Sequence, residues 1–389
     1  MSPAHSHAPV EGADEDVAPH VVRILRLSVA LAAVAVVVGA IFLWPGDRSG
    51  DADPLGLDSD PVNAQVAAAI EGPCSADPSA RCVSIGFVIE DGPQAGDTGV
   101  IEQQAPTPIG VGDGIEIIVA ETPEGEPIYS FYDFDRDTSL IVLAVLFAAS
   151  VLILGRWRGL GALAGLSLSL FVIVWFALPS LVDGNNAVAV ALVTSGAVAI
   201  LALYLAHGAG AATDVAVVST LASLALTGIL AWIFVGASKL TGFTDDPTFV
   251  LRALGNEIDP RGILLAGIVI GSLGVLDDVT VTQVSAVWEL HRHSPDAGRR
   301  ELFTSALRIG RDHISSTVNT LVLAYAGATL PLLLLFSAIG QPASEVASRE
   351  VVATEIIRAL VGSIGLVAAV PISTGLAIQV VTSGRGERR

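Results

Sequence analysis

The chain has 389 residues, 52% of them hydrophobic, yet its formal net charge is −19. Only 15% of the residues are charged, against roughly 25% in an average soluble domain. A strongly apolar and a strongly acidic character fit one chain when they lie in different segments, so the composition predicts membrane helices beside acidic solvated parts. It excludes an ordinary soluble enzyme, a collagen, a disordered chain and a disulfide-rich mini-protein. The acidic balance also argues against a nucleic-acid partner.

The N-terminal region predicts a tail and one anchor. Residues 1–21 are rich in His, Pro and acidic residues, which indicates a disordered cytoplasmic tail. The apolar run over 22–43 is long enough to cross a bilayer, which takes roughly 20 residues as a helix. Because the run is longer than the apolar part of a signal peptide and no small-residue cleavage site follows it, we expect an uncleaved transmembrane anchor. A cleaved signal peptide is the alternative.

Residues 44–138 form the one solvated block. They hold 19 acidic residues against 3 Arg, and so most of the negative charge of the chain. After an acidic linker, short runs of alternating apolar and polar residues are separated by Gly, Asp and Pro turns, which predicts a small β-rich domain, a barrel or a sandwich. Cys74 and Cys82 are the two cysteines of the chain, and we predict that they form a disulfide in an oxidising extracytoplasmic compartment. Free thiols or half of a metal site are the alternatives.

Seven further apolar runs follow, over about 140–154, 160–182, 187–206, 215–236, 262–287, 314–339 and 352–381. The sequence therefore predicts an all-α polytopic membrane bundle of about eight transmembrane helices, with the β-rich domain between the first two. The bundle after that domain occupies 139–382, and 383–389 form a cytoplasmic tail. Twelve of the 20 Lys and Arg then lie in the short inner segments, so the positive-inside rule predicts a cell-membrane protein with cytoplasmic N- and C-termini and an extracytoplasmic 44–138.

Three features predict local geometry within the bundle. The basic loop 291–311 contains an amphipathic stretch, 301–308, that we expect to lie along the inner membrane surface. Residues 155–159 are expected to form a turn, and Pro331 is expected to kink its helix. Glu355 and Arg358 are three residues apart in the last run, where they are expected to form a structural ion pair near the outer end.

Asp277 and Asp278 are ionisable residues at membrane depth in the sixth run. Inserting such a side chain costs roughly 2.5–3.5 kcal/mol, so it usually faces a protein interior and serves a function. Two adjacent carboxylates in a low-dielectric site can take up and release protons near neutral pH, which predicts a proton or cation site. A hydrogen bond that ties Asp278 to Asn319 or Arg311 is the structural alternative. One helical face carries Asp278 and its neighbours at spacings of three and four: Gly267, Gly271, Gly274, Thr282, Ser285 and Glu289.

Other polar residues extend this candidate pathway. Thr282, and Ser316 with Asn319 in the next run, are expected near Asp278 and line the predicted proton, cation or substrate pathway. Hydrogen bonding between helices is the alternative for Ser316 and Asn319. The secondary candidates lie near the inner helix ends: His207, Asp214, Arg311 and Asp312. For His207 and Asp214 a solvated pair at a loop end is the alternative.

The sequence lacks the motifs of common catalytic sites. It contains no P-loop, no HExxH, no GxSxG and no Cys/His ligand spacing, so we expect no enzyme activity, no cofactor and no metal site. The expected partners are the lipid bilayer and a small solute or ion. A homo-oligomer or an envelope protein partner is also compatible with the sequence.

Several segments resemble the YibE/F-like membrane protein family. They are 271–279 (GSLGVLDDV), 301–303 (ELF), 309–333 (IGRDHISSTVNTLVLAYAGATLPLL), 355–358 (EIIR) and 362–366 (GSIGL). The resemblance covers about 140–382 and implies a multi-helix membrane fold rather than a defined activity. The family pattern has one Asp at the position of Asp278, so Asp277 is an addition in this chain. The Asp-bearing run, the basic loop and the next run also show a local similarity to the core helices of RND-type proton-driven permeases, in which paired Asp residues relay protons.

The sequence favours a permease-like membrane protein that moves a small solute or ion, with Asp277 and Asp278 as a buried carboxylate pair. The polar face that they share with the glycines of the sixth run carries this hypothesis. The alternative is a non-transporting envelope assembly or sensor protein. In that case the outer β-domain binds a partner and the bundle serves as an anchor.

Overall fold

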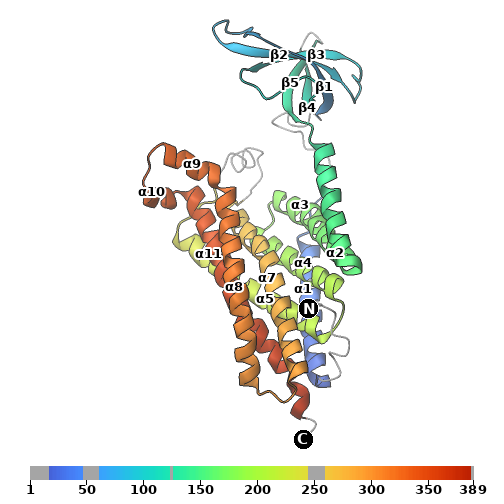
Figure 1. Cartoon of the computed structure of the whole chain (residues 1–389), viewed down its shortest axis with the longest axis vertical. Helices are drawn as coiled ribbons and strands as arrows, with labels where there is room; N and C mark the ends of the chain where they lie inside the picture. The colour runs from blue at the N-terminus through green and yellow to red at the C-terminus, as the bar shows by residue number, and fades with distance from the viewer. Residues whose placement is uncertain (1–16, 47–60, 123–125, 244–258, 387–389) are drawn as a thin grey trace, which may run out of the picture. The chain divides into compact units, whose positions relative to one another are not determined.

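The computed structural model describes residues 17–46, 61–122, 126–243 and 259–386 (Figure 1). Most of the predicted N-terminal tail, the acidic linker over 47–60 and the last three residues lie outside the described residues. By its contacts the chain divides into two compact units. One consists of 48–154, and the other of 1–47 with 155–389.

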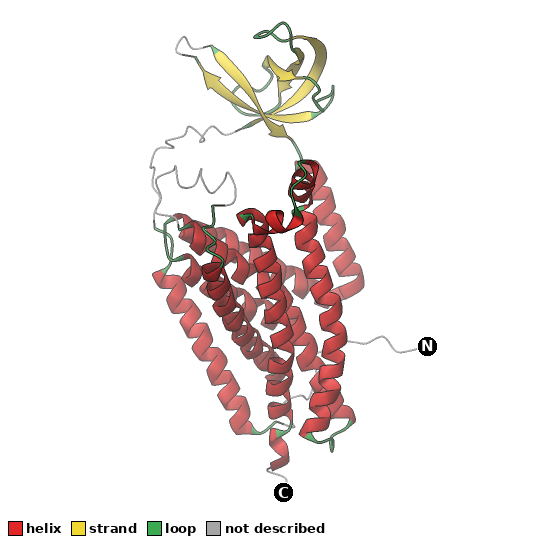
Figure 2. Ribbon diagram, turned by 90° about the vertical axis from the view of Figure 1, so that its left-hand side faces the viewer, coloured by secondary structure: helices red, strands yellow, loops and turns green. Residues whose placement is uncertain are grey.

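The first unit contains the predicted β-domain. Its antiparallel strands are β1 (Val62–Pro73), β2 (Arg81–Ile89), β3 (Thr98–Gln104), β4 (Gly114–Glu121) and β5 (Pro127–Phe134), in the order β3-β2-β1-β4-β5 (Figure 2). The two edge strands, β3 and β5, also approach each other, so the sheet curls into a barrel-like shape. Alternate residues of the strands point inward, as their sequence pattern predicts, and Ile85, Phe87, Ile115 and Ile117 form the centre of the core.

The predicted disulfide is confirmed. Cys74 follows β1, Cys82 lies in β2, and their sulfur atoms are bonded across the turn that joins these strands. Both side chains are buried, with 8% and 7% of their surface exposed. The bond therefore closes the longest hairpin of a small domain whose core is modest in size.

The helices are α1 (Pro19–Phe42), α2 (Asp137–Val172), a π-helical turn (Ile173–Ala177), α3 (Leu178–Val182), α4 (Ala187–His207), α5 (Ala211–Ala237), α7 (Pro260–His293), α8 (Arg299–Ala328), α9 (Leu330–Ala338), α10 (Ala343–Ser348) and α11 (Glu350–Val381). Seven helical segments among the described residues are long and apolar enough to span a membrane, or eight if the bent pair α8–α9 counts as one span. The predicted number of about eight membrane-spanning helices is therefore confirmed by the length and composition of the helices.

Two breaks follow the sequence, and one expectation is wrong. Arg156 has a φ of 52° inside α2, so the predicted turn at 155–159 divides α2 into two spans, Asp137–Trp157 and Gly159–Val182. The axes of α8 and α9 differ by 59° at the break just before Pro331, which lacks the N–H that would continue the helix. The expectation for the amphipathic stretch 301–308 is wrong, because this stretch is not a separate surface helix. It forms the first turns of α8, with Leu302 and Ala306 buried against other helices.

Helices α5, α7 and α11 form the centre of the second unit, and α4 packs against α5 and α7 (Figure 1). Gly365 of α11 lies in direct contact with Thr227 of α5, where any larger residue would collide with the threonine side chain. Thr220 of α5 and Thr280 of α7 join their hydroxyl groups at 2.6 Å. In a bilayer, helices associate through small residues and hydrogen bonds of this kind, because water does not drive apolar surfaces together there.

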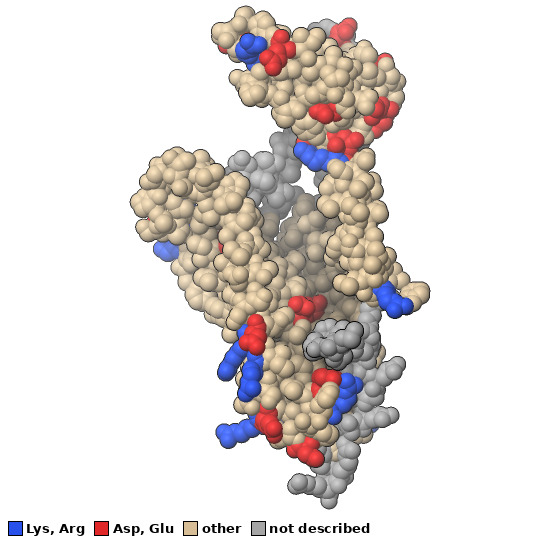
Figure 3. Space-filling view, in the orientation of Figure 1, with Lys and Arg blue, Asp and Glu red and all other residues tan. Residues whose placement is uncertain are grey.

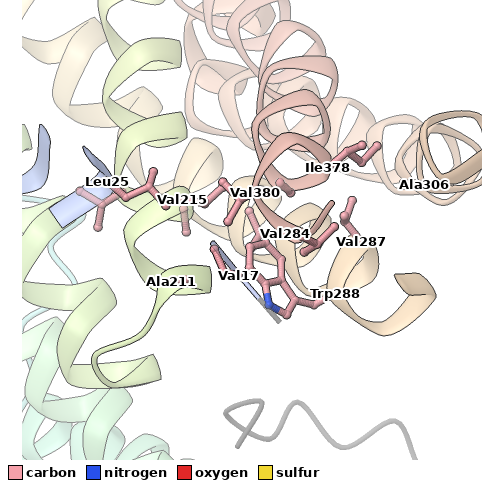
Figure 4. Close-up of a cluster of buried hydrophobic side chains, with 14 of the residues drawn as sticks. Val17, Leu25, Ala211, Val215, Val284, Val287, Trp288, Ala306, Ile378 and Val380 are labelled. Carbon is pink, nitrogen blue, oxygen red and sulfur yellow. The ribbon is translucent and has the colours of Figure 1, made fainter. Parts of the chain in front are cut away.

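One end of this unit is closed by a cluster of apolar side chains (Figure 4). The cluster brings together the first described residue, Val17, with Trp288 of α7 and Val380 of α11. The backbone N–H of Ala18 donates to Oγ of Ser383 at 3.1 Å, so the start of α1 and the end of α11 lie at the same end of the unit. The sequence predicts a disordered tail up to residue 21, and this is wrong for 17–21, because Val17 and Ala18 are buried and α1 begins at Pro19.

The disulfide predicts a stability difference in the β-domain. Replacing both cysteines, Cys74→Ser with Cys82→Ser, should lower the free energy of unfolding of this domain by about 2–3 kcal/mol, because the unfolded chain loses a constraint. Pulse proteolysis in urea, followed through cleavage within 62–134 of the full chain, measures the change. Reduction of the unaltered protein should give the same shift, and equal urea midpoints would contradict this role.

The packing of α7 against α8 predicts a contrast between two glycines. Gly310 of α8 lies against Gln283 of α7 and Val370 of α11, whereas a methyl group on Gly274 of α7 would meet no atom within 4 Å among the described residues. Gly310→Ala should therefore cost about 1–3 kcal/mol through overpacking and lower the melting temperature in detergent. Gly274→Ala is the matched control, and it should keep or raise that temperature because Ala is the better helix former.

Candidate functional site

The two carboxylates of α7 have different surroundings. Asp278 lies near the middle of the helix with 71% of its side chain exposed. Asp277 is half-buried, and its Oδ1 atom is inaccessible and has no hydrogen-bond partner among the described residues. The expectation of a buried pair therefore fits Asp277 and not Asp278. The face that Asp278 shares with Gly267, Gly271 and Gly274 points away from the packed centre, since all four are exposed.

A histidine of α8 lies opposite Asp278. The Nε2 atom of His313 is 3.7 Å from Oδ2 of Asp278, within ion-pair range but longer than a hydrogen bond. The His313 side chain is 34% exposed, and its Nε2 atom is buried. The sequence reasoning did not select His313 as a site residue. The available signal was its position at the start of the next span, which an antiparallel α8 brings to the depth of Asp278.

The remaining residues of the predicted pathway are not joined to Asp278. Ser316 and Asn319 of α8 are exposed, and Thr282 of α7 is half-buried. The carbonyl oxygen of Ser316 accepts a hydrogen bond from the hydroxyl of Thr320 at 3.1 Å within α8. No hydrogen bond links Ser316, Asn319 or Thr282 to Asp278 in the part of the chain that the structure describes.

Of the secondary candidates, His207 and Asp214 lie on other helices than this pair, whereas Arg311 and Asp312 directly precede His313 in α8. Asp214 is buried in the first turn of α5, where the hydroxyl of Tyr204 donates a hydrogen bond to its Oδ1 atom. That burial does not fit a solvated loop-end pair, although His207 is exposed. Arg311 and Asp312 are both exposed at the start of the span formed by α8. The structure thus brings neither His207 nor Asp214 to the Asp278–His313 pair.

A buried polar network lies between the central helices, and the sequence reasoning missed it. The Nε2 atom of Gln283 donates to the hydroxyl of Thr374 at 3.2 Å and to the carbonyl oxygen of Ala306 at 3.3 Å. It therefore joins α7 to α11 and to α8. The Oε1 atom of Gln283 is buried and has no hydrogen-bond partner among the residues described. The signal for such a network was a glutamine in an apolar run, with Thr282 before it and Ser285 two residues after it.

The ion pair expected in the last span is confirmed. Nη1 of Arg358 lies 2.8 Å and 3.1 Å from the two carboxylate oxygens of Glu355, and both side chains are about three-quarters buried. The guanidinium carbon is 5.9 Å from the centre of the Tyr325 ring of α8. The Arg358–Glu355 pair is thus a second set of charged side chains within a membrane-length helix, and Arg358 lies beside α7 and α8.

A cavity of about 440 Å³ lies at the N-terminal ends of α4 and α7. Its polar lining includes Asn185, Asn186, Asp259 and Arg261, and Trp232 of α5 borders it. Asp259 caps α7 by accepting a hydrogen bond from the backbone N–H of Arg261 at 3.1 Å. The cavity is therefore built from helix caps and is separate from Asp278.

The charges of the helical unit are unevenly distributed. On the face drawn in Figure 3, most blue and red atoms of this unit lie over its lower half, and the upper half is mostly tan. An uncharged surface of this kind suits contact with acyl chains. No group of three or more His, Cys, Asp or Glu in the described segments could hold a metal ion.

Comparison with known proteins gives one match. The YibE/F-like protein family matches residues 143–383, which is more than half of the chain and includes Asp277, Asp278, His313 and Arg358. No curated protein and no solved structure matches. The match begins after the β-domain and ends with α11, so it coincides with the membrane-length helices that follow that domain. The chain therefore belongs to the YibE/F-like family and is an integral membrane protein.

Proposed function

We propose that this protein is a permease that moves a small solute or ion, with Asp278, His313 and Asp277 as the site that exchanges the coupling proton or cation. The observation that carries the proposal is the 3.7 Å approach of Asp278 and His313 between two membrane-length helices. An ionisable group at this depth is costly and is usually retained for function.

The chemistry of the three groups supports proton exchange. Carboxylate and imidazole can share one proton, and the net charge of the pair changes as protons bind or leave. Asp278 is accessible, whereas the neighbouring Oδ1 atom of Asp277 is buried and lacks a hydrogen-bond partner among the described residues. One carboxylate can therefore receive a proton at the surface of α7 while the other offers an acceptor inside the helix bundle. A carrier that couples solute movement to protons needs one proton-binding group that is accessible and one that is enclosed, as these two carboxylates are.

We further infer that residues 44–138 lie outside the cell membrane and that both chain ends are cytoplasmic. The disulfide supports an oxidising compartment for the β-domain, and the common end of α1 and α11 supports an even number of spans. A cysteine placed at the exposed Val100 of the β-domain should react in intact cells with a membrane-impermeant thiol reagent. A cysteine at Asp296, between α7 and α8, should react only after the membrane is opened, and the reverse pattern would contradict this orientation.

The permease proposal predicts loss of proton exchange on neutralising Asp278. Asp278→Asn keeps the size of the side chain but removes its protonation, so proton flux should fall by roughly tenfold or more. The measurement is the internal pH of proteoliposomes after an imposed pH gradient, with a pH-sensitive dye inside. Asp296→Asn, an exposed carboxylate in the loop between α7 and α8, is the matched control and should leave the flux unchanged.

Equal flux in the unaltered protein and in Asp278→Asn would contradict the permease proposal. That outcome would favour the envelope assembly or sensor role. The β-domain exposes the apolar side chains of Ile70, Val100 and Ile128, which offer a surface for a protein partner in that case.

A further inference from the structure

Arg358 of α11 holds its partner with only part of its guanidinium group. It lies eight residues into the helix, about 12 Å from its start at 1.5 Å per residue. Nη1 reaches both carboxylate oxygens of Glu355. The Nε atom is buried and has no hydrogen-bond partner among the described residues, and no described group accepts a hydrogen bond from Nη2 either. The edge of the guanidinium formed by Nε and Nη2 is therefore unpaired.

Two glycines of α7 lie near Arg358 and Tyr325. A Cβ atom on Gly267 would lie 3.9 Å from Nη2 of Arg358, and one on Gly271 would lie 3.6 Å from the hydroxyl of Tyr325. Both glycines are exposed. The guanidinium group thus lies between the Tyr325 ring of α8 and the bare backbone of α7. One turn further along α11, a Cβ atom on Gly362 would lie 3.4 Å from the hydroxyl of Ser272 and 3.5 Å from Leu321.

The free edge has the geometry of an oxyanion receptor. Nε–H and Nη2–H of an arginine point in parallel and match the two oxygens of a carboxylate, which gives a bidentate pair. An unsatisfied donor within a membrane-length helix is costly in an apolar medium, so a ligand that accepts both hydrogen bonds is favoured there. Glu355 cannot fill this role, because it already occupies Nη1.

We propose that the free edge of Arg358, between Tyr325 and Gly267, binds the carboxylate group of a small organic solute. This inference rests on the proposed function, since it names the class of solute that the permease moves. Gly267 and Asp278 are eleven residues apart on one exposed face of α7, about 16 Å along its axis. The solute site and the proton site would then lie along the same face of one helix.

The local charge favours a monoanion. Glu355 already balances Arg358, so a single carboxylate adds one negative charge, whereas a phosphate dianion adds two. The ring of Tyr325 offers an apolar and aromatic surface for the body of the solute. A lipid headgroup presents the same oxyanion chemistry through its phosphate, and the experiment distinguishes that source.

Benzoate is the probe, and benzamide is its neutral counterpart of the same shape. Binding is measured as the shift in melting temperature of the full chain in an uncharged detergent, where a ligand that binds the folded state raises that temperature. Benzoate should stabilise the protein at millimolar concentration and benzamide should not. Inorganic phosphate, and vesicles of neutral lipid with added anionic lipid, form the two comparison arms.

Variants test whether Arg358 is the receptor. Replacing both members of the pair, Arg358→Gln with Glu355→Gln, avoids an unpaired charge and should weaken benzoate binding roughly tenfold or more. Glu355→Gln alone should strengthen binding severalfold, because it removes the neighbouring negative charge. A merely structural ion pair would not produce that gain. Arg349→Gln is the control, since Arg349 bonds Gln341 and contacts the Phe336 ring instead.

Three outcomes would overturn the inference. They are absence of benzoate binding, equal binding by the double variant, and a preference for phosphate or anionic lipid over benzoate. The test is separate from that of the proton site, because binding in detergent needs no proton flux and should persist in Asp278→Asn. Proton flux without benzoate binding overturns the carboxylate site alone, and benzoate binding with unchanged flux in Asp278→Asn overturns the proposed coupling site.

Discussion

Close contact among α5, α7 and α11 is the interaction on which the helical unit depends. Lipid chains are as apolar as leucine, so these helices gain little from hiding apolar surface and must pack through small residues and hydrogen bonds. Gly365 against Thr227 allows α11 to approach α5, and the Thr220–Thr280 hydroxyl pair joins α5 to α7. Helix α4 packs against α5 and α7, and α8 packs against α7 and α11.

The same centre accounts for the outward position of Asp278. Its interior is mainly apolar and also holds buried hydroxyl groups, and Gln283 joins α7 to α8 and α11. A buried neutral hydroxyl or amide costs less than a buried carboxylate, which would need a compensating charge in that space. Asp278 therefore lies on the opposite face of α7, where His313 approaches from α8.

Two charged groups share the surface formed by α7, α8 and α11. Arg358 with Glu355 lies toward the start of α11, and Asp278 with His313 lies nearer the middle of α7. Exposed glycines separate the two pairs along α7 and leave space beside its backbone. In a bilayer such a surface needs water, a ligand or another protein against it, because lipid cannot solvate a carboxylate. This requirement connects the proposed solute site with the proposed proton site.

The sequence by itself determined the membrane helices, the β-domain, the disulfide and the ion pair of α11. Each follows from a local signal: apolar length, alternation, two cysteines, or charges three residues apart. It also located Asp277 and Asp278, because a charge in an apolar run is conspicuous. Only the tertiary structure decided which face of α7 is buried, that His313 lies opposite Asp278, and that Gln283 bonds Thr374 of α11 and Ala306 of α8. A stripe of glycine and polar residues fits a packed face and an open one equally well, and the choice between them depends on contacts among helices far apart in the chain.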